Sequence, residues 1–142
     1  MDHGGSRSKA AWALGLYCLL LAFILLSPSA ELPSASVSLI ADVGRAVGVP
    51  EVFLSGSRTE FLVNAAMFVP VSLLGSIVWK GTTWRDWTAY VFLASGLAEL
   101  VQGVVLSERS ATFVDVVANT LGALAGGVLI WIVRQRDELT GP

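Results

Sequence analysis

The chain has 142 residues, of which 54% are hydrophobic and 14% charged, and its formal net charge is −2. Soluble domains carry about 25% charged residues, so this composition and a mean hydropathy of +0.70 exclude an ordinary soluble domain and indicate a membrane protein. The basic residues form no stripe, so we exclude nucleic acid as a partner. A membrane-spanning helix uses about 20 residues, and the length therefore suits one domain over residues 1–142.

The first apolar run covers residues 10–26 and follows two basic residues. It has the features of either a membrane span or a signal peptide. The run is longer than the usual signal core of about 7–15 residues, and Pro28 and Pro33 disrupt any small-x-small cleavage site. We therefore predict a retained span that ends before Pro28, where the proline ring would break a continuing helix.

The segment at residues 29–59 is too polar, and too often interrupted by proline and glycine, to cross a bilayer. Within it Leu39, Ile40, Val43 and Val47 recur at helical spacing, so we expect a short amphipathic helix on the outer membrane surface. This helix would either cover the polar groups between the spans or serve only as a connector.

Three further apolar runs, at residues 61–80, 87–106 and 113–133, bring the predicted number of spans to four. Pro70 lies in the middle of the first of these runs and removes a helical hydrogen bond, so we expect a kink there. Only a short polar loop, residues 107–110, separates the last two runs, which makes them antiparallel neighbours. The predicted fold class is an all-α polytopic membrane protein.

The basic residues predict the orientation, because Lys and Arg near span ends stay preferentially on the cytoplasmic side. With the N-terminus inside, the inner set is Arg7, Lys9, Lys80, Arg85, Arg134 and Arg136, and the outer set is Arg45, Arg58 and Arg109. The tryptophans Trp79, Trp84 and Trp87 bracket the inner turn, as an interfacial aromatic belt would. We therefore predict that both termini lie in the cytoplasm.

Three pairs of polar residues lie near the predicted outer ends of the last three spans, and the members of each pair share one helix face. The pairs are Glu60 and Asn64, Glu99 and Gln102, and Asp115 and Asn119, and Arg109 lies in the loop between the last two spans. An ionisable group at a helix centre costs about 2.5–3.5 kcal/mol even on the lenient insertion scale. We therefore expect these seven residues to converge in the outer half of the bilayer, where they offset one another's cost.

Two interpretations of this cluster remain open, and they are compatible. In the first, the carboxylates and Arg109 form an extracytoplasmic pocket for a polar or charged headgroup. In the second, an ion-pair and amide network holds the helices together, because polar residues bind helices to one another in lipid. The residues leave open whether the protein is an enzyme, but the single histidine, His3, lies in the N-terminal tail and excludes a Ser-His or Cys-His hydrolase.

No metal or other cofactor is expected at the cluster. Carboxylate and amide oxygens would suit Mg²⁺ or Ca²⁺, and the absence of His and Cys argues against zinc. Arg58 and Arg109, however, are cations on loops that can bind the same carboxylates, and they lower the case for a metal ion.

One spacing pattern connects three of the predicted helices. It runs Asn64-x3-Phe68-x-Pro70 and then Glu99-x2-Gln102-x6-Arg109-x5-Asp115-x3-Asn119-x2-Gly122. This pattern, over residues 60–126, resembles the VanZ-like family of small bacterial membrane proteins, whose founding member is associated with resistance to the glycopeptide teicoplanin. The resemblance implies a role at the outer face of the bacterial cytoplasmic membrane, near lipid-linked cell-wall material. It does not supply a reaction.

Three local features bear on how this chain would fit the family pattern. Gly122 and Gly126 form a small-xxx-small ridge that favours close helix packing. Ser72 stands where the family often has a glycine, so packing near the expected kink would differ. Thr112 stands where many members have an additional acidic residue, which makes this site less acidic; Thr112 or Ser110 is the expected N-cap of the last helix.

These observations predict a membrane protein that binds or modifies an amphiphilic cell-envelope molecule, such as a lipid-linked cell-wall precursor, from the outer leaflet. The alternative is a structural or assembly protein whose polar cluster only ties its own helices together. A transporter is disfavoured, because four short spans show no inverted repeat. Only an oligomer would restore a transport function, and the oligomeric state stays open.

Overall fold

A computed structural model describes residues 3–25, 31–54, 56–105 and 112–140 of the chain. The regular structure of these ranges is helical throughout, as the predicted all-α fold class requires. The elements are α1 (His3–Leu25), α2 (Glu31–Ala46), the 3-10 turn η1 (Glu51–Phe53), α3 (Ser57–Val78), α4 (Trp84–Val105) and α5 (Phe113–Thr140). The helices extend beyond several predicted spans, because hydropathy marks only the apolar part of a helix.

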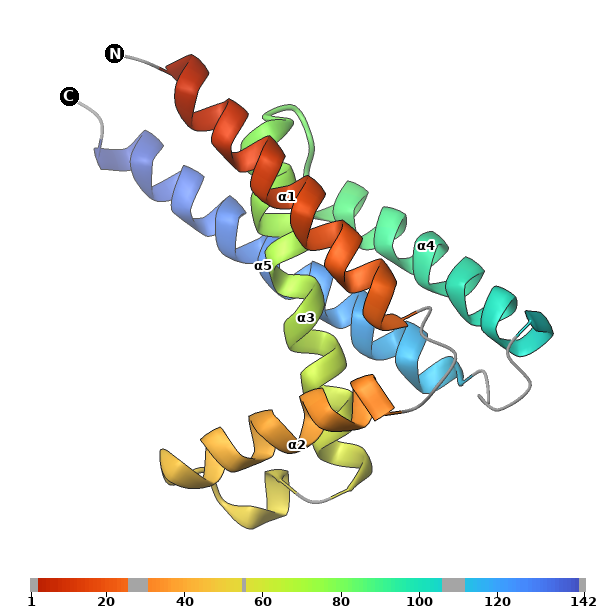
Figure 1. The fold of residues 1–142 in the computed structure, drawn as a ribbon. Helices are drawn as coiled ribbons and strands as arrows, with labels where there is room; N and C mark the ends of the chain where they lie inside the picture. Colours follow the sequence, from red (N-terminus) through yellow and green to blue (C-terminus); the bar gives the residue numbers. More distant parts are fainter. Residues whose placement is uncertain (1–2, 26–30, 55, 106–111, 141–142) are drawn as a thin grey trace.

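Four of the helices form a bundle, and α2 lies across one end of it (Figure 1). The most extensive contacts are those of α5 with α3 and with α4, while α1 packs mainly on α3. The first residues of α1 and the last residues of α5 lie at the same end of the bundle, opposite α2 (Figure 1). We name the end at which α3 and α5 begin the polar end, and the end at which α3 stops the basic end.

Glycines of α5 allow its close approach to both neighbours. A Cβ atom built on Gly122 would lie 1.9 Å from the carbonyl oxygen of Ala65 in α3. One on Gly126 would lie 2.3 Å from the Ser72 hydroxyl oxygen, and one on Gly127 would lie 2.9 Å from the Trp84 Cα atom of α4. The predicted ridge therefore forms the contact with α3, since only residues without a side chain permit such backbone separations.

The core lies where α1, α3, α4 and α5 meet. It consists of Leu14, Leu21, Phe68, Val71, Trp87, Val91 and Ala123. The hydroxyl of Tyr17 in α1 donates a hydrogen bond of 2.7 Å to the carbonyl oxygen of Met67, and α3 continues through Pro70 one turn later. Both packing and this hydrogen bond join α1 to the rest of the bundle.

Three helical segments of the described chain are long and apolar enough to cross a membrane: Gly5–Leu25, Ser57–Val78 and Phe113–Leu139. Helix α4 has a span's length and contains Glu99 and Gln102, and it is not among these three segments. Many large apolar side chains of the bundle are exposed, as lipid contact requires. Among them are Leu16, Leu19, Phe23, Phe92, Leu93, Leu97, Leu100, Val104 and Leu129.

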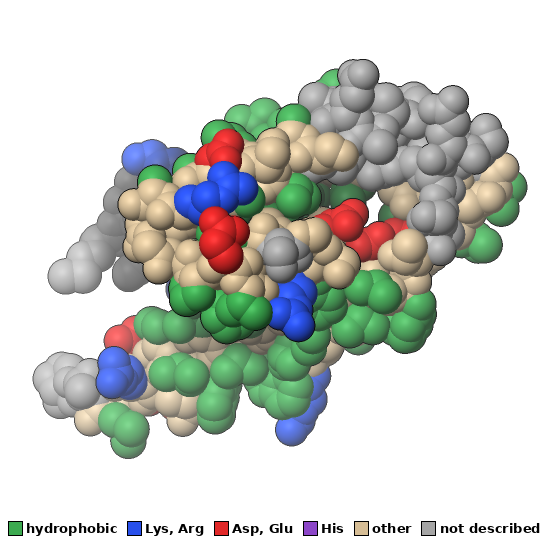
Figure 2. All heavy atoms as spheres, turned by 90° about the horizontal axis from the view of Figure 1, so that it is seen from below, with side chains coloured by type: hydrophobic (Ala, Val, Ile, Leu, Met, Phe, Trp, Pro, Cys, Tyr) green, Lys and Arg blue, Asp and Glu red, His purple; other side chains and the backbone are tan. Residues whose placement is uncertain are grey.

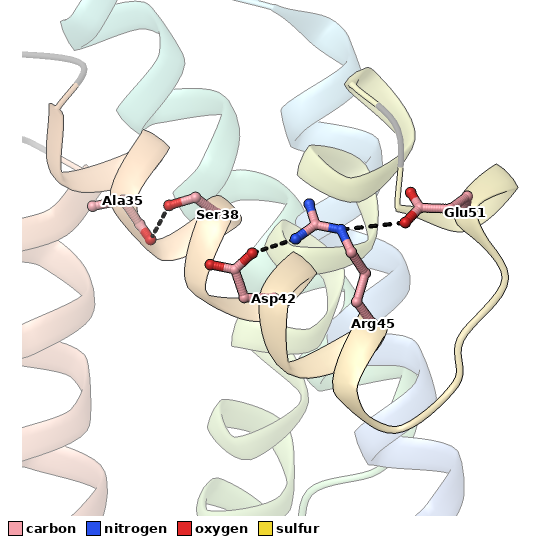
Figure 3. Close-up of polar contacts among 5 residues, drawn as sticks. All are labelled: Ala35, Ser38, Asp42, Arg45 and Glu51. Atoms are coloured by element: carbon pink, nitrogen blue, oxygen red, sulfur yellow. Dashed lines mark hydrogen bonds and ion pairs between the residues drawn. The ribbon is translucent and has the colours of Figure 1, made fainter.

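Helix α2 and the η1 turn are held together by one arginine. Arg45, in the last turn of α2, binds the Asp42 carboxylate and forms an ion pair of 3.3 Å with Glu51 in η1 (Figure 3). The chain reverses between the two elements at Gly48, whose φ of 82° lies in the region that favours glycine. Leu39 and Val43 of α2 are exposed, whereas Ala41 is buried.

The glycine contact between α3 and α5 leads to a stability prediction. In Gly122→Ala the added methyl group would overlap the Ala65 carbonyl oxygen, so the helices must separate. We expect the free energy of unfolding to fall by about 1–3 kcal/mol, the usual cost of overpacking, in a denaturant titration in mixed micelles. The matched control is Gly96→Ala in α4, because nothing lies within 4 Å of a Cβ at that exposed position. Equal stability of the two variants would contradict the prediction.

Candidate functional site

The first turn of α5 is the centre of the polar cluster. Since α5 begins at Phe113, Thr112 occupies the N-cap position. Its hydroxyl accepts a hydrogen bond of 3.3 Å from the Asp115 amide and donates one of 2.7 Å to the Asp115 carboxylate. Two of the predicted features, the cap and the acidic residue of α5, are therefore one hydrogen-bonded unit.

Glu99 of α4 completes the cap of α5. The Thr112 amide donates a hydrogen bond of 2.7 Å to a carboxylate oxygen of Glu99. In an ordinary capping box, an acidic residue three positions after the cap accepts this bond. Here Asp115 holds that position but binds the hydroxyl, and Glu99 from a neighbouring helix binds the amide. Thr112 thus binds carboxylates from two helices, one through its amide and one through its hydroxyl.

Asn64 connects this unit to α3. Its side-chain amide nitrogen donates a hydrogen bond of 2.7 Å to the second carboxylate oxygen of Asp115. Both Asp115 oxygens therefore have neutral donors, one from Asn64 and one from Thr112. The N-terminus of α5 also favours a negative charge nearby, because the backbone amides of the first helical turn carry partial positive charge. A continuous network, Asn64–Asp115–Thr112–Glu99, consequently joins α3, α5 and α4 at the polar end.

Asn119 lies one turn deeper along α5 than Asp115, on the same helix face. It is 3% exposed, and within the described ranges its side-chain oxygen has no hydrogen-bond partner. Leaving a buried acceptor unsatisfied costs about 1–3 kcal/mol. An external donor placed beside Asn119 would recover this cost.

The remaining predicted residues are not joined to this network by hydrogen bonds in the described part of the chain. Glu60 is exposed in the first turn of α3. Gln102, 5% exposed, donates to the backbone carbonyl of Leu25 and so ties α4 to the end of α1. Arg58 donates a hydrogen bond of 3.1 Å to the Val52 carbonyl in η1. Arg109 lies outside the described residues.

Acidic side chains are visible on the face that Figure 2 presents, which looks onto the end of the molecule where α2 lies. The Asp115 and Glu99 carboxylates bind donors within the network rather than each other. Within the described ranges no group of three or more His, Cys, Asp or Glu side chains could hold a metal ion.

A family model described as VanZ/LLP1 matches residues 14–134. The chain belongs to the VanZ/LLP1 family. The match extends beyond the 60–126 segment of the sequence resemblance and includes about half of α1, all of α2 to α4 and most of α5. Comparison with curated proteins and with solved structures found no match. Family membership and the apolar helices together establish a VanZ-like membrane protein.

Both departures of this VanZ/LLP1 protein from the expected family pattern have a structural explanation. Ser72 is fully buried, and its hydroxyl donates a hydrogen bond of 3.1 Å to the Val69 carbonyl. The absence of a side chain at Gly126 leaves room for that hydroxyl. Thr112 supplies the cap and a donor for Asp115. The sequence indicated Thr112 as a cap candidate and as the loss of an acidic residue but did not predict its bond to the Asp115 carboxylate, although the cap position itself signals contact with the first turn of the helix.

Removal of the Thr112 hydroxyl tests whether the cap organises the cluster. Thr112→Val keeps the shape but loses the bonds to the Asp115 amide and carboxylate, and we expect about 1–2 kcal/mol lower unfolding free energy. Thr120→Val is the matched control, because the Thr120 hydroxyl only donates to the Val116 carbonyl within the same helix. A denaturant titration in micelles compares the two. If Thr120→Val is as destabilising as Thr112→Val, the cap has no special role.

Proposed function

We propose that this protein binds the polar headgroup of an amphiphilic cell-envelope molecule at the outer face of the bacterial cytoplasmic membrane. The observation that carries the proposal is the buried, unpartnered oxygen of Asn119 beside a network in which both Asp115 oxygens are satisfied. A network that served only to hold helices together would be expected to satisfy its own buried acceptors. One that leaves an acceptor open is suited to a ligand.

The ligand class follows from the chemistry of the side chains. Carboxylates and a side-chain carbonyl oxygen accept hydrogen bonds, so the complementary headgroup carries hydroxyl, amide or ammonium donors. Sugars and peptides attached to a lipid carrier have these groups, which favours a lipid-linked cell-wall precursor. Arg109, which precedes α5 in the sequence, is the residue we assign to a phosphate of such a carrier. The resemblance to the VanZ-like family, which implies a role near lipid-linked cell-wall material, agrees with this ligand class.

The proposal includes four spans with both termini in the cytoplasm. Helix α4 exposes Phe92, Leu93, Leu97 and Leu100, which supports contact with lipid despite its polar residues. The start of α1 and the end of α5 lie at the same end of the bundle, which supports an even number of membrane crossings (Figure 1). In this orientation the polar end opens to the extracytoplasmic side, with α2 lying at the membrane surface beside it.

A structural role is the second candidate, and the network itself favours it. Hydrogen bonds from Asn64 and Thr112 join α3, α4 and α5 through Asp115 and Glu99. Such bonds stabilise membrane helices by about 0.6 kcal/mol each on average, and by at most about 1.7 kcal/mol. The two candidates make opposite predictions for Asn119, which takes no part in these bonds.

Replacing Asn119 separates binding from stability. Asn119→Leu removes the unpartnered oxygen and keeps the number and branching of the side-chain heavy atoms, so we expect unfolding free energy equal to or above that of the wild type. We also expect at least tenfold weaker binding of a purified lipid-linked disaccharide–peptide precursor, measured by native mass spectrometry in micelles. Asn64→Leu is the control for the structural role, because it breaks the bond to Asp115 and should lower stability. Unchanged precursor binding by Asn119→Leu would refute the proposal.

The orientation is tested by cysteine labelling in intact cells. In a Cys18→Ser background, single cysteines replace Ser57 at the start of α3 and Gly81 after its end, both exposed positions. An impermeant thiol reagent is expected to label the cysteine at 57 and to leave the one at 81 unlabelled until the membrane is permeabilised. The reverse pattern would place the polar end in the cytoplasm and exclude a ligand from the outer leaflet.

A further inference from the structure

A cleft lies at the basic end, between the last turns of α3 and the C-terminal part of α5. Its volume is about 310 Å³, and it is lined by Ser76, Ile77, Lys80, Ile130 and Arg134. This volume is at the lower end of the range of about 300–1,000 Å³ usual for small-molecule sites. The lining combines two aliphatic side chains with two cations.

Arg134 is held in the cleft by the end of α3. Its guanidinium donates to the Ser76 carbonyl, and to the carbonyls of Thr82 and Lys80 at 3.3 and 3.5 Å. These acceptors are neutral, and the C-terminus of α3 favours a nearby cation. In the described part of the chain neither Arg134 nor Lys80 forms an ion pair with a carboxylate. Two positive charges therefore border the cleft without an acidic partner among the described residues.

Ser76 adds a hydroxyl to this pair of cations. Its side chain is 1% exposed, and within the described ranges its oxygen has no hydrogen-bond partner. A hydroxyl donor beside two cations is complementary to an anion with several acceptor oxygens, and a phosphate is such an anion. The free donor of Ser76 is an observation independent of the charges.

The apolar side chains indicate the source of the phosphate. Ile77 and Ile130 line the cleft, and the adjacent residues Trp79 and Trp131 are about half exposed. Exposed tryptophans at the ends of membrane helices lie at the depth of lipid headgroups. Basic pockets between such helices bind anionic headgroups. We propose that this cleft binds an anionic phospholipid, with its phosphodiester at Lys80, Arg134 and Ser76 and an acyl chain along Ile77 and Ile130.

The test compares phosphatidylglycerol with phosphatidylcholine of the same acyl chains, titrated into the purified protein in neutral detergent and followed by native mass spectrometry. We expect tighter binding of phosphatidylglycerol, and about fivefold weaker binding in Lys80→Gln, the effect of one basic residue near an anionic lipid. Ser76→Ala should also weaken binding while leaving the lipid-free melting temperature unchanged, because the hydroxyl has no partner to lose. Lys9→Gln, an exposed lysine of α1, is the control and should bind as the wild type does.

Three results would overturn the proposal: equal affinity for the two lipids, wild-type binding by both Lys80→Gln and Ser76→Ala, or equal weakening by Lys9→Gln. Millimolar inorganic phosphate is added as a competitor. If phosphate fails to displace the bound phosphatidylglycerol, the result supports a lipid site. If phosphate displaces it as effectively as added phosphatidylglycerol does, the site binds a soluble phosphate ligand instead. None of these outcomes depends on the headgroup proposed for the polar end, since the residues involved lie at the opposite end of the bundle.

Discussion

The close contact between α3 and α5 determines the geometry of both ends of the bundle. A side chain at Gly122 would collide with the Ala65 backbone, so the two helices can meet this closely only without one. Near the start of both helices, Asn64, the residue before Ala65, donates a hydrogen bond to Asp115. Towards their ends, the Ser76 carbonyl accepts one from Arg134. The two helices therefore run in the same direction, and one pair of helices positions the residues of both candidate sites.

Carboxylates are tolerated at the polar end because the same hydrogen bonds satisfy both the carboxylate oxygens and the unpaired groups at the start of α5. The first amides of any helix lack intrahelical partners, and a carboxylate away from water needs donors. Glu99 binds the Thr112 amide, while Asp115 binds the hydroxyl that caps its own helix. Because these hydrogen bonds also join the helices, a structural and a functional interpretation both fit these residues. Asn119 separates the two interpretations, since its oxygen satisfies none of the helix amides.

Hydropathy and charge predicted much of this arrangement, and the shortfalls have physical reasons. The convergence of Asn64, Glu99 and Asp115 follows from topology, because all three lie near span ends that must meet. Gln102 was expected on the same face as Glu99, but three residues leave about 60° between side chains on a helix. That rotation directs Gln102 to the end of α1 and Glu99 to α5.

Contacts between elements were the least predictable. The link between Arg45 and Glu51 depends on the chain reversal at Gly48, which residue spacing alone does not specify. Pro33 was interpreted as an interruption, yet α2 begins at Glu31 and includes it, because proline is tolerated in the first turn of a helix. The role of Thr112 depends on the packing of α4, which places the Glu99 carboxylate at the Thr112 amide. Local patterns specify helices, whereas these contacts depend on how the helices pack.

The direction shared by α3 and α5 also explains why the two ends differ in chemistry. Helix N-termini stabilise negative charge and C-termini stabilise positive charge. At the polar end the start of α5 therefore holds Asp115 and Glu99, and at the basic end the finish of α3 holds Arg134. Groups left open beside the carboxylates accept hydrogen bonds, and those left open beside the cations donate them. The two proposed ligands follow this difference, because a donor-rich headgroup suits the acceptors of the polar end and a phosphodiester suits the cations of the basic end.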